Sequence, residues 1–287
     1  MARIATVFLS TGLQGTSVVK ALLKDGTFKP RAVTRNVNSD AARAMADFGC
    51  EVVEAGFDDK EAIKKAVTGA ECVFLVTYPF GSNVPEVTQG QNVIDASKEA
   101  GVKFMVLSSL PSVSEVSKGN YTKVAHYDDK ATVQKYLEAS GLSCASVVPG
   151  AFLENILRGF LNCPFLKTET GYLMHTMERP GSKSLQTWTG RDMGPAVTAL
   201  FTQYTSRLSE IDKQTFTLGC CRATVEETAA ELAKGLGKPV EIKRIGPIGY
   251  EAVDQMVLRL ARLRRPGQAL EALGVKVGTI EEFAGLL

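Results

Sequence analysis

The most constraining feature of this 287-residue chain is a regular alternation of short β-branched runs with segments of helical period. The runs are RIATVFL (3–9), PRAVT (30–34), EVVEA (51–55), VFLVT (73–77), FMVLSS (104–109) and SCASVVP (143–149). Runs that are apolar almost throughout indicate strands buried on both faces, as in a parallel sheet covered by helices. The sequence therefore predicts an α/β fold with a doubly wound parallel sheet of the Rossmann type and six strands.

Helices are predicted between these strands. They cover Ser39–Phe48, a longer segment around Val84–Ala100, and a segment that begins near His126. Gly49, Gly101 and Gly141 stand where such helices end, and glycine is favoured there because it adopts a left-handed conformation without strain.

The pattern changes after Pro149, where glycine and proline become frequent. We expect a Rossmann domain at 1–155 and a smaller α+β lobe at 156–287, with some segments of the second range returning to the first domain. Capping boxes at Thr224/Glu227 and Thr279/Glu282 predict two helix starts in the lobe. A basic run at 258–267 contains Arg259, Arg262, Arg264 and Arg265, and it fits either a solvated helix end or a partner-binding patch.

Composition narrows the class of protein. Apolar residues make up 45% of the chain and charged residues 22%, which is typical of a globular domain. The net charge of +2 gives no basis for direct nucleic-acid readout. The first apolar segment is too short for a signal sequence or a membrane span, so we expect a cytoplasmic protein. Six cysteines without a CxxC pair and only two histidines make a metal site unexpected.

The stretch VFLSTGLQG (7–15) joins the first predicted strand to the first helix. In a dinucleotide-binding turn the first glycine permits the bend, the second lets the backbone approach the pyrophosphate, and the third lets helix and strand pack. Here Leu9 replaces the first glycine, while Gly12 and Gly15 remain. A dinucleotide site is predicted, with backbone strain of about 1–2 kcal/mol at Leu9 if its φ is positive; a vestigial turn is the alternative.

The end of the second strand indicates which dinucleotide would bind. NAD-binding proteins usually carry an acidic residue there, whereas this chain has Arg35, Asn36, Asn38 and Ser39. These residues suit a 2′-phosphate and therefore NADP(H). Arg35 could instead be an ordinary surface arginine.

The chain resembles the NmrA-like family, a group of atypical short-chain dehydrogenase/reductase relatives. The resemblance rests on STGLQGTSVVKALL, EVTQGQNV, AHYDDKATVQKYL, TGRDMGPAV and TIEEF, which span nearly the whole chain. It implies a Rossmann domain that binds NADP(H) and a small lobe that closes a substrate cleft. The implied cofactor contacts are Thr11, Gly12, Leu13, Gln14, Gly15, Arg35, Asn36, Asn38, Ser39, Phe57, Asp58, Thr77, Tyr78, Pro79, Gln91, Ser108, Ser109, Lys130, Gly150, Ala151, Phe152, Leu153 and Glu154.

The sequence departs from that family's pattern at three of its positions. Leu9 replaces a glycine, Gly56 stands where aspartate is frequent, and Gln91 stands where a lysine is expected. The resemblance therefore implies weaker cofactor binding than is usual in the family.

The tyrosine and lysine of ordinary reductases, Y-x-x-x-K, become His126-x-x-x-Lys130. Helical spacing places both on the face that packs inward. Lys130 could reach the cofactor ribose or form a peripheral salt bridge. His126 could be a general acid or base, or a packed imidazole. Tyr78, Tyr127 and Glu154 are further proton-donor candidates.

Three functions fit these observations. The first is an NADPH-dependent reductase of an apolar, aromatic or polycyclic small molecule. The second is an NADP(H) sensor that binds a protein partner without turnover, and the third is an acid/base enzyme that keeps the cofactor structurally. A homodimer is compatible with each. Side chains expected to line the substrate cleft are Phe152, Phe160, Phe165, Tyr172, Met174 and Trp188.

Overall fold

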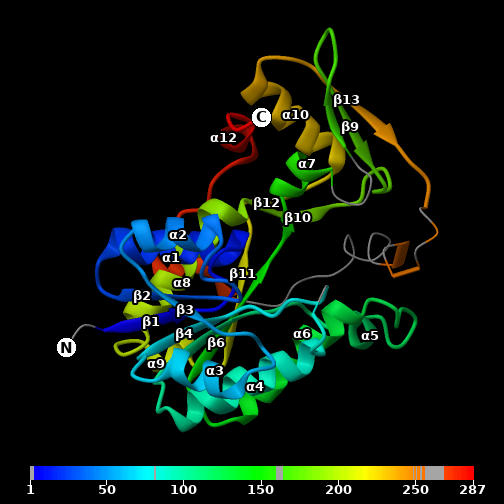
Figure 1. The fold of residues 1–287 in the computed structure, drawn as a ribbon. Coiled ribbons are helices and arrows are strands. Elements are labelled where there is room, and N and C mark those ends of the chain that lie inside the picture. The colour runs from blue at the N-terminus through cyan, green and yellow to red at the C-terminus, as the bar shows by residue number, and fades with distance from the viewer. Residues whose placement is uncertain are drawn as a thin grey trace.

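An eight-stranded sheet forms the centre of the structure, a computed structural model that describes residues 3–80, 82–159, 164–247, 249, 251–252, 254–255 and 268–287. The strand order is β14-β11-β6-β5-β4-β1-β2-β3, and every neighbouring pair is parallel (Figure 1). The predicted doubly wound parallel sheet is confirmed. Its strands are β1 (Ile4–Val7), β2 (Lys29–Thr34), β3 (Glu51–Glu54), β4 (Cys72–Leu75), β5 (Phe104–Ser108), β6 (Cys144–Pro149), β11 (Gln214–Leu218) and β14 (Gln268–Ala269).

Helices cover both faces of this sheet (Figure 1). One face carries α1 (Leu13–Asp25), α2 (Asp40–Asp47) and α8 (Thr189–Gln203); the other carries α3 (Lys60–Val67), α4 (Glu86–Glu99) and α6 (Ala125–Ala139). Gly49, Gly101 and Gly141 have φ values of 90°, 74° and 90°, so the predicted helix-ending role is confirmed. Shorter helices are α5 (Val113–Val116), α9 (Leu208–Ile211) and the 3₁₀ helix η2 (Leu270–Leu273).

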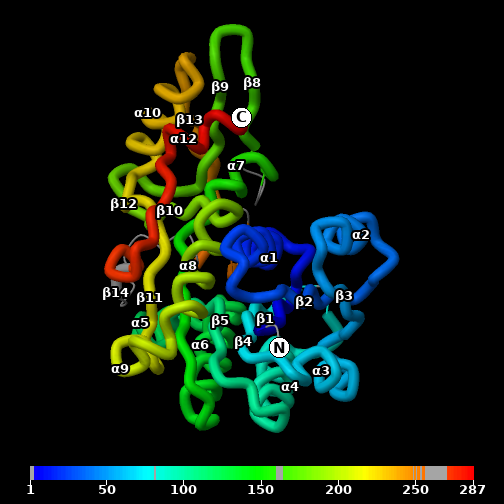
Figure 2. The backbone as a smooth tube through the Cα atoms, turned by 90° about the vertical axis from the view of Figure 1, so that its left-hand side faces the viewer, coloured from blue at the N-terminus to red at the C-terminus, as the bar shows by residue number. Residues whose placement is uncertain are grey.

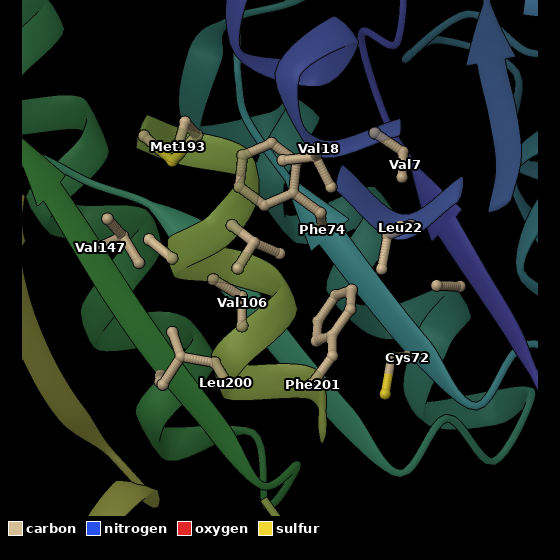
Figure 3. Close-up of a cluster of buried hydrophobic side chains, with 14 of the residues drawn as sticks. Val7, Val18, Leu22, Cys72, Phe74, Val106, Val147, Met193, Leu200 and Phe201 are labelled. Carbon is tan, nitrogen blue, oxygen red and sulfur yellow. The ribbon is translucent and has the colours of Figure 1, made fainter. Parts of the chain in front are cut away.

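Helices α1 and α8 pack closely against each other. The Gly194 N–H donates a 2.9 Å hydrogen bond to Ser17 Oγ, and a Cβ atom at Gly194 would lie 2.1 Å from the Ser17 carbonyl oxygen. Below this contact, side chains of both helices meet the sheet in one buried cluster (Figure 3). Because α8, β11 and β14 follow residue 156, the sheet unit draws on both sequence ranges.

A smaller lobe lies beyond one end of the sheet (Figures 1 and 2). Its first sheet holds β7 (Ala151–Phe152), β10 (Ser184–Thr187) and β12 (Cys221–Ala223); its second holds β8 (Phe165–Lys167), β9 (Tyr172–Thr176) and β13 (Val240–Arg244). The helices are α7 (Glu154–Arg158), α10 (Val225–Leu236) and α12 (Ile280–Ala284). Both predicted capping boxes are present, at the starts of α10 and α12.

The basic run at 258–267 lies outside the described residues. Within the described ranges, no helix has the length and hydropathy that a membrane span requires.

Candidate functional site

Two pockets lie where the parallel strands end. The small pocket, about 170 Å³ in volume, is bordered by residues that follow β1, β2, β3 and β4. The large pocket, about 360 Å³ in volume, lies between the ends of β5 and β6, helix α6 and the lobe. In open α/β sheets ligands bind at this carboxyl edge, where neighbouring crossovers diverge. The small pocket is lined by Leu9, Arg35, Gly56, Phe57, Asp58, Tyr78, Ser82, Asn83 and Val84.

The turn between β1 and α1 keeps its shape without its first glycine. Leu9 has a φ of 48°, so the condition for backbone strain at this position is met. The Gly12 N–H donates a 2.9 Å bond to the Leu9 carbonyl oxygen. A Cβ atom at Gly15 would lie 2.2 Å from that same oxygen, which leaves room for glycine alone. The tight approach of helix to strand is therefore retained, and the strain is carried by Leu9.

The strain at Leu9 can be measured with two variants. Leu9→Ala keeps a side chain at the positive φ, whereas Leu9→Gly removes the strain; both lose the packing of the leucine side chain. We expect Leu9→Gly to be more stable than Leu9→Ala by about 1 kcal/mol, because a left-handed non-glycine residue costs more than the extra chain entropy of glycine. Urea unfolding of both variants measures the difference. Equal stabilities would show that the turn adopts another conformation.

The N-terminus of α1 presents free backbone amides to the carboxyl edge of the sheet. Gly12 caps the helix without a side-chain hydrogen bond, and the first turn of α1 contains no acidic residue. The first N–H groups of a helix have no partner within it, and the helix dipole adds positive potential there. This end of α1 can therefore receive a phosphate.

Of the residues predicted to bind a 2′-phosphate, only Arg35 lines the small pocket. Its side chain is exposed and forms no ion pair with any residue that the structure describes. Ser39 Oγ caps α2 by accepting a 3.2 Å bond from the Ala42 N–H. Asn36 Oδ1 accepts a 2.9 Å bond from the Asn38 N–H, so these two residues stabilise the loop itself.

Phe57, Asp58 and Tyr78 line the small pocket as well, opposite Arg35 along the ends of β3 and β4. Phe57 stacks on Phe8 with ring centroids 6.0 Å apart. Gly56 accommodates the Asp58 carboxylate, because a Cβ atom at Gly56 would lie 2.5 Å from Asp58 Oδ1. The departure from the family pattern at Gly56 thus has a local cause.

The large pocket gathers most residues predicted for the catalytic side. Ser108 Oγ donates a 2.6 Å bond to Gln14 Oε1, which ties the end of β5 to the first turn of α1. Ser109 Oγ makes a weaker 3.4 Å contact with the Lys130 carbonyl oxygen. The predicted residues that line this pocket are Gln14, Ser108, Ser109, His126, Tyr127, Lys130, Gly150, Ala151 and Phe152. Thr11, Gly12, Leu13, Gly15, Thr77, Pro79, Gln91, Leu153 and Glu154 line neither pocket.

Lys130 forms a buried ion pair with Glu86. The side chains of Lys130 and Glu86 are 10% and 2% exposed. The ammonium also donates to the Thr77 carbonyl oxygen at 2.8 Å and to Thr77 Oγ1 at 2.9 Å, so all three of its N–H groups are used. Burial lowers the pKa of Lys130, and the neighbouring Glu86 carboxylate opposes that change. The salt bridge foreseen as an alternative for Lys130 is present, but it is buried rather than peripheral.

His126 is one of a row of rings at the large pocket. Its ring centroid lies 5.8 Å from that of Phe80 and 5.0 Å from that of Tyr127. Burial lowers the pKa of His126, against the opposing influence of the Glu86 charge. A neutral imidazole is a weak proton donor, so this environment favours a packing role over a general acid.

Glu154 and Leu153 contact the protein interior rather than the large pocket. The Glu154 carboxylate accepts bonds from the Gly190 N–H at 2.6 Å and the Thr189 N–H at 3.2 Å, at the first turn of α8. Leu153 is fully buried in the lobe core. Neither residue faces the large pocket. The two N–H donors hold the Glu154 side chain at the start of α8, away from the lining of the large pocket.

The lobe supplies part of the expected aromatic lining. Phe152, Phe165 and Met174 line the large pocket, whereas Trp188 packs edge-on against Phe283 in the lobe core. Tyr172 stacks on Phe165 from behind, with ring centroids 5.1 Å apart. Phe160 lies outside the described residues.

Three functional candidates were missed by sequence reasoning. Glu86 pairs with a lysine 44 positions away. Gln89 is fully buried and holds the loop after β4 through bonds to both backbone groups of Tyr78. Glu178 lines the large pocket from the lobe. No local pattern marks these residues, because each contact joins segments that only the fold brings together.

Comparison with known proteins gives one family. The NmrA-like family model matches residues 1–265. The NmrA-like family domain-containing oxidoreductase malD of Malbranchea aurantiaca is 33% identical over 217 residues, which is 69% of this chain and 64% of malD. The chain spans about half to two thirds of the length of the curated relatives it matches, with 45%, 49% and 64% for three of them.

Solved structures share the fold along nearly the whole chain. NmrA, a negative transcriptional regulator in complex with NADP, superposes with a TM-score of 0.79 at 18% identity, covering 99% of this chain and 94% of NmrA. The Citrobacter sp. triphenylmethane reductase complexed with NADP(H) gives a TM-score of 0.75 at 19% identity, covering 98% and 99%. At these identities the likeness concerns the fold alone.

Proposed function

This chain belongs to the NmrA-like family, and from that premise we propose that it binds NADP(H) along the carboxyl edge of the sheet and reduces an apolar aromatic or polycyclic small molecule in the large pocket. The supporting observation is the placement of the two pockets. One lies beyond the ends of β1 to β4 and the other beyond β5 and β6. Leu9 of the β1–α1 turn lines the first, and Gln14 of the first turn of α1 lines the second. An extended dinucleotide fits such an arrangement, with its adenosine end in the small pocket and its nicotinamide at the large one.

The residues present fit this cofactor. The uncapped amides of α1 and the contact that excludes a side chain at Gly15 suit a pyrophosphate. Arg35, an exposed cation at the small pocket, suits a 2′-phosphate. The relatives support this assignment, since NmrA and the triphenylmethane reductase are both described in complex with NADP or NADP(H).

NADPH supplies a hydride in reactions of this class. The chain's own contribution is to bind, orient and exclude water. The Ser108–Gln14 bond fixes the pocket wall next to the phosphate-binding turn. Phe80, Phe152 and Phe165 form apolar walls that suit a flat substrate.

The proposal is tested by calorimetry with NADPH, followed by steady-state NADPH oxidation with a panel of quinones and heteroaromatic imines and identification of the reduced product. We expect binding together with product formation on at least one member of the panel. Absence of both a binding heat and a thermal shift with NADPH would refute the cofactor assignment.

A second candidate is an NADP(H) sensor that acts through a protein partner. The observation in its favour is that Lys130 is fully engaged by Glu86 and Thr77, while burial lowers the pKa of His126, so the His126–Lys130 pair is poorly suited to donate a proton. Partner capture that changes between NADP⁺ and NADPH, with no turnover on the panel, would favour this function.

Arg35→Ala is expected to weaken NADPH binding by roughly 10- to 100-fold and to leave NADH binding nearly unchanged, because a charge-assisted phosphate contact contributes about 1.5–3 kcal/mol. Calorimetry with both nucleotides measures the effect. Arg244→Ala is the matched control, since Arg244 is exposed on β13 of the lobe and pairs with Glu226 outside both pockets. Equal losses for NADPH and NADH would refute the 2′-phosphate assignment.

A further inference from the structure

Glu178 places a carboxyl group at the wall of the large pocket. It follows β9 and is partly buried. Its carboxylate accepts only two long contacts from Ser184 Oγ, at 3.3 and 3.5 Å. Within the described part of the chain it forms no ion pair with any lysine, arginine or histidine. Burial raises the pKa of Glu178, which reflects a carboxylate without a compensating cation.

The other charges at the large pocket are already balanced or suppressed. Lys130 is paired with Glu86, and burial disfavours the charged form of His126. His175 Nδ1 lies 3.0 Å from the Pro164 carbonyl oxygen, so a backbone group occupies one of its ring nitrogens. Glu178 is thus the carboxylate that the described pocket lining leaves without a counter-ion.

The remaining walls suit a cation of a particular kind. Aromatic rings attract cations over their faces, and the attraction is strongest where water is excluded. Five rings border the large pocket: Phe80, His126, Tyr127, Phe152 and Phe165. An apolar cation with a delocalised charge would contact these rings and the Glu178 carboxylate together, whereas a small hydrated cation would not.

We propose that the large pocket takes an apolar organic cation, an iminium or N-alkylated heteroaromatic ring, with its positive nitrogen held by Glu178. The inference rests on the proposed reductase function and names its substrate class. It also assigns Glu178 as the residue that discriminates charged from neutral substrates.

Reduction of such a cation balances without a proton donor. A hydride adds to the carbon of the C=N⁺ bond, and the π electron pair becomes the lone pair of nitrogen. The substrate gains two electrons and loses its charge, and the nicotinamide is oxidised by the same two electrons. Reduction of a quinone, by contrast, requires a proton at oxygen. A cationic substrate therefore accounts for a site in which His126 replaces the usual tyrosine acid.

The test uses N-methylquinolinium as the cationic probe and 1-methylnaphthalene as a neutral probe of nearly the same shape, bound to the full chain with NADP⁺ present. We expect Glu178→Gln to weaken binding of the cation by roughly 10- to 100-fold and to change binding of the neutral probe less than about 2-fold. Glu178→Asp, which keeps the charge, should retain preference for the cation. Glu231→Gln is the matched control, because Glu231 is an acidic lobe residue on α10 that pairs with Lys234 outside the pocket.

Three outcomes would overturn the inference: unchanged cation affinity in Glu178→Gln, equal losses for both probes, or no preference of the native protein for the cation. Thermal unfolding of each variant confirms that it is folded. NADPH oxidation with N-methylquinolinium and with a neutral quinone is measured separately. Glu178-dependent cation binding without NADPH oxidation would refute the reductase function while supporting the cation site. If NADPH is oxidised with the quinone, Glu178→Gln leaves that rate unchanged and the native protein shows no preference for the cation, the reductase function is supported and the cation site is refuted.

Discussion

Lys130→Ala should lower the free energy of unfolding by about 3–5 kcal/mol, the scale found when one partner of a buried ion pair is removed. The substitution would leave the Glu86 carboxyl group, 2% exposed in its side chain, without its cation. Glu86 Oε2 already has no hydrogen-bond partner among the described residues, and without Lys130 the carboxyl group would keep only the 2.6 Å bond that Thr77 Oγ1 donates to Oε1. Urea unfolding at neutral pH measures the loss.

The control is the double variant Lys130→Met/Glu86→Leu, which replaces the pair by apolar side chains of similar length. We expect it to recover most of the lost stability, because an apolar pair avoids the desolvation cost of two charges. If Lys130→Ala and the double variant were equally unstable, the unpaired Glu86 carboxyl group would not be the cause of the lost stability. The double variant also tests the ribose contact predicted for Lys130. If stability is restored but NADPH affinity stays reduced, the contact is supported; if both are restored, the contact is refuted.

Gly15→Ala should abolish measurable NADPH binding and destabilise the fold by about 1–3 kcal/mol. The added Cβ atom would lie 2.2 Å from the Leu9 carbonyl oxygen and 2.7 Å from Ser10 Cα. Both are backbone atoms, so the turn must open, and opening it displaces the amides of α1 from the position that a phosphate requires. Calorimetry with NADPH and urea unfolding read the two effects.

Alanine substitutions at two further glycines distinguish the effect on stability from the effect on NADPH binding. At Gly12 an added Cβ atom meets the Leu9 carbonyl oxygen at 3.3 Å, so we expect Gly12→Ala to fold with little loss yet to weaken NADPH binding, since the second glycine lets the backbone approach the pyrophosphate. At Gly246 an added Cβ atom meets nothing within 4 Å, and Gly246→Ala should change neither quantity. Native NADPH affinity in Gly15→Ala would contradict this account of the turn.

Local patterns were sufficient for the parts of the fold that depend on neighbours in sequence. The six strands up to Pro149, the helix-ending glycines and both capping boxes are determined by residues a few positions apart, and the structure has them all. The sheet has eight strands rather than the predicted six, because β11 and β14 were not identified: β11 pairs with β6 far back in the chain, and β14 pairs with β11. The location of the candidate site at the carboxyl edge of the sheet followed from the fold class.

The candidate site was predictable in outline and not in its electrostatics. The residues after β1 and β2 were identified from their place next to predicted strands, and those after β5 from the family resemblance. Helical spacing predicted the inward face of the helix that carries His126 and Lys130. The partner of Lys130 was not, because Glu86 belongs to a different helix. Glu178 gave no signal either, since an isolated glutamate reads as a surface residue until the fold places it at a pocket.

The close packing of α8 on α1 has a consequence for how a ligand enters. Strand β10 of the lobe leads directly into α8, and α8 is fixed to α1 through Gly194 and Ser17. At the other end of this junction, Glu154 of the lobe anchors the first turn of α8. The lobe is thus attached through α8 to α1, and a rigid-body rotation of the whole lobe would have to break these contacts. We therefore expect the width of the cleft between lobe and sheet to be the same with and without ligand, so that only sufficiently flat ligands enter it.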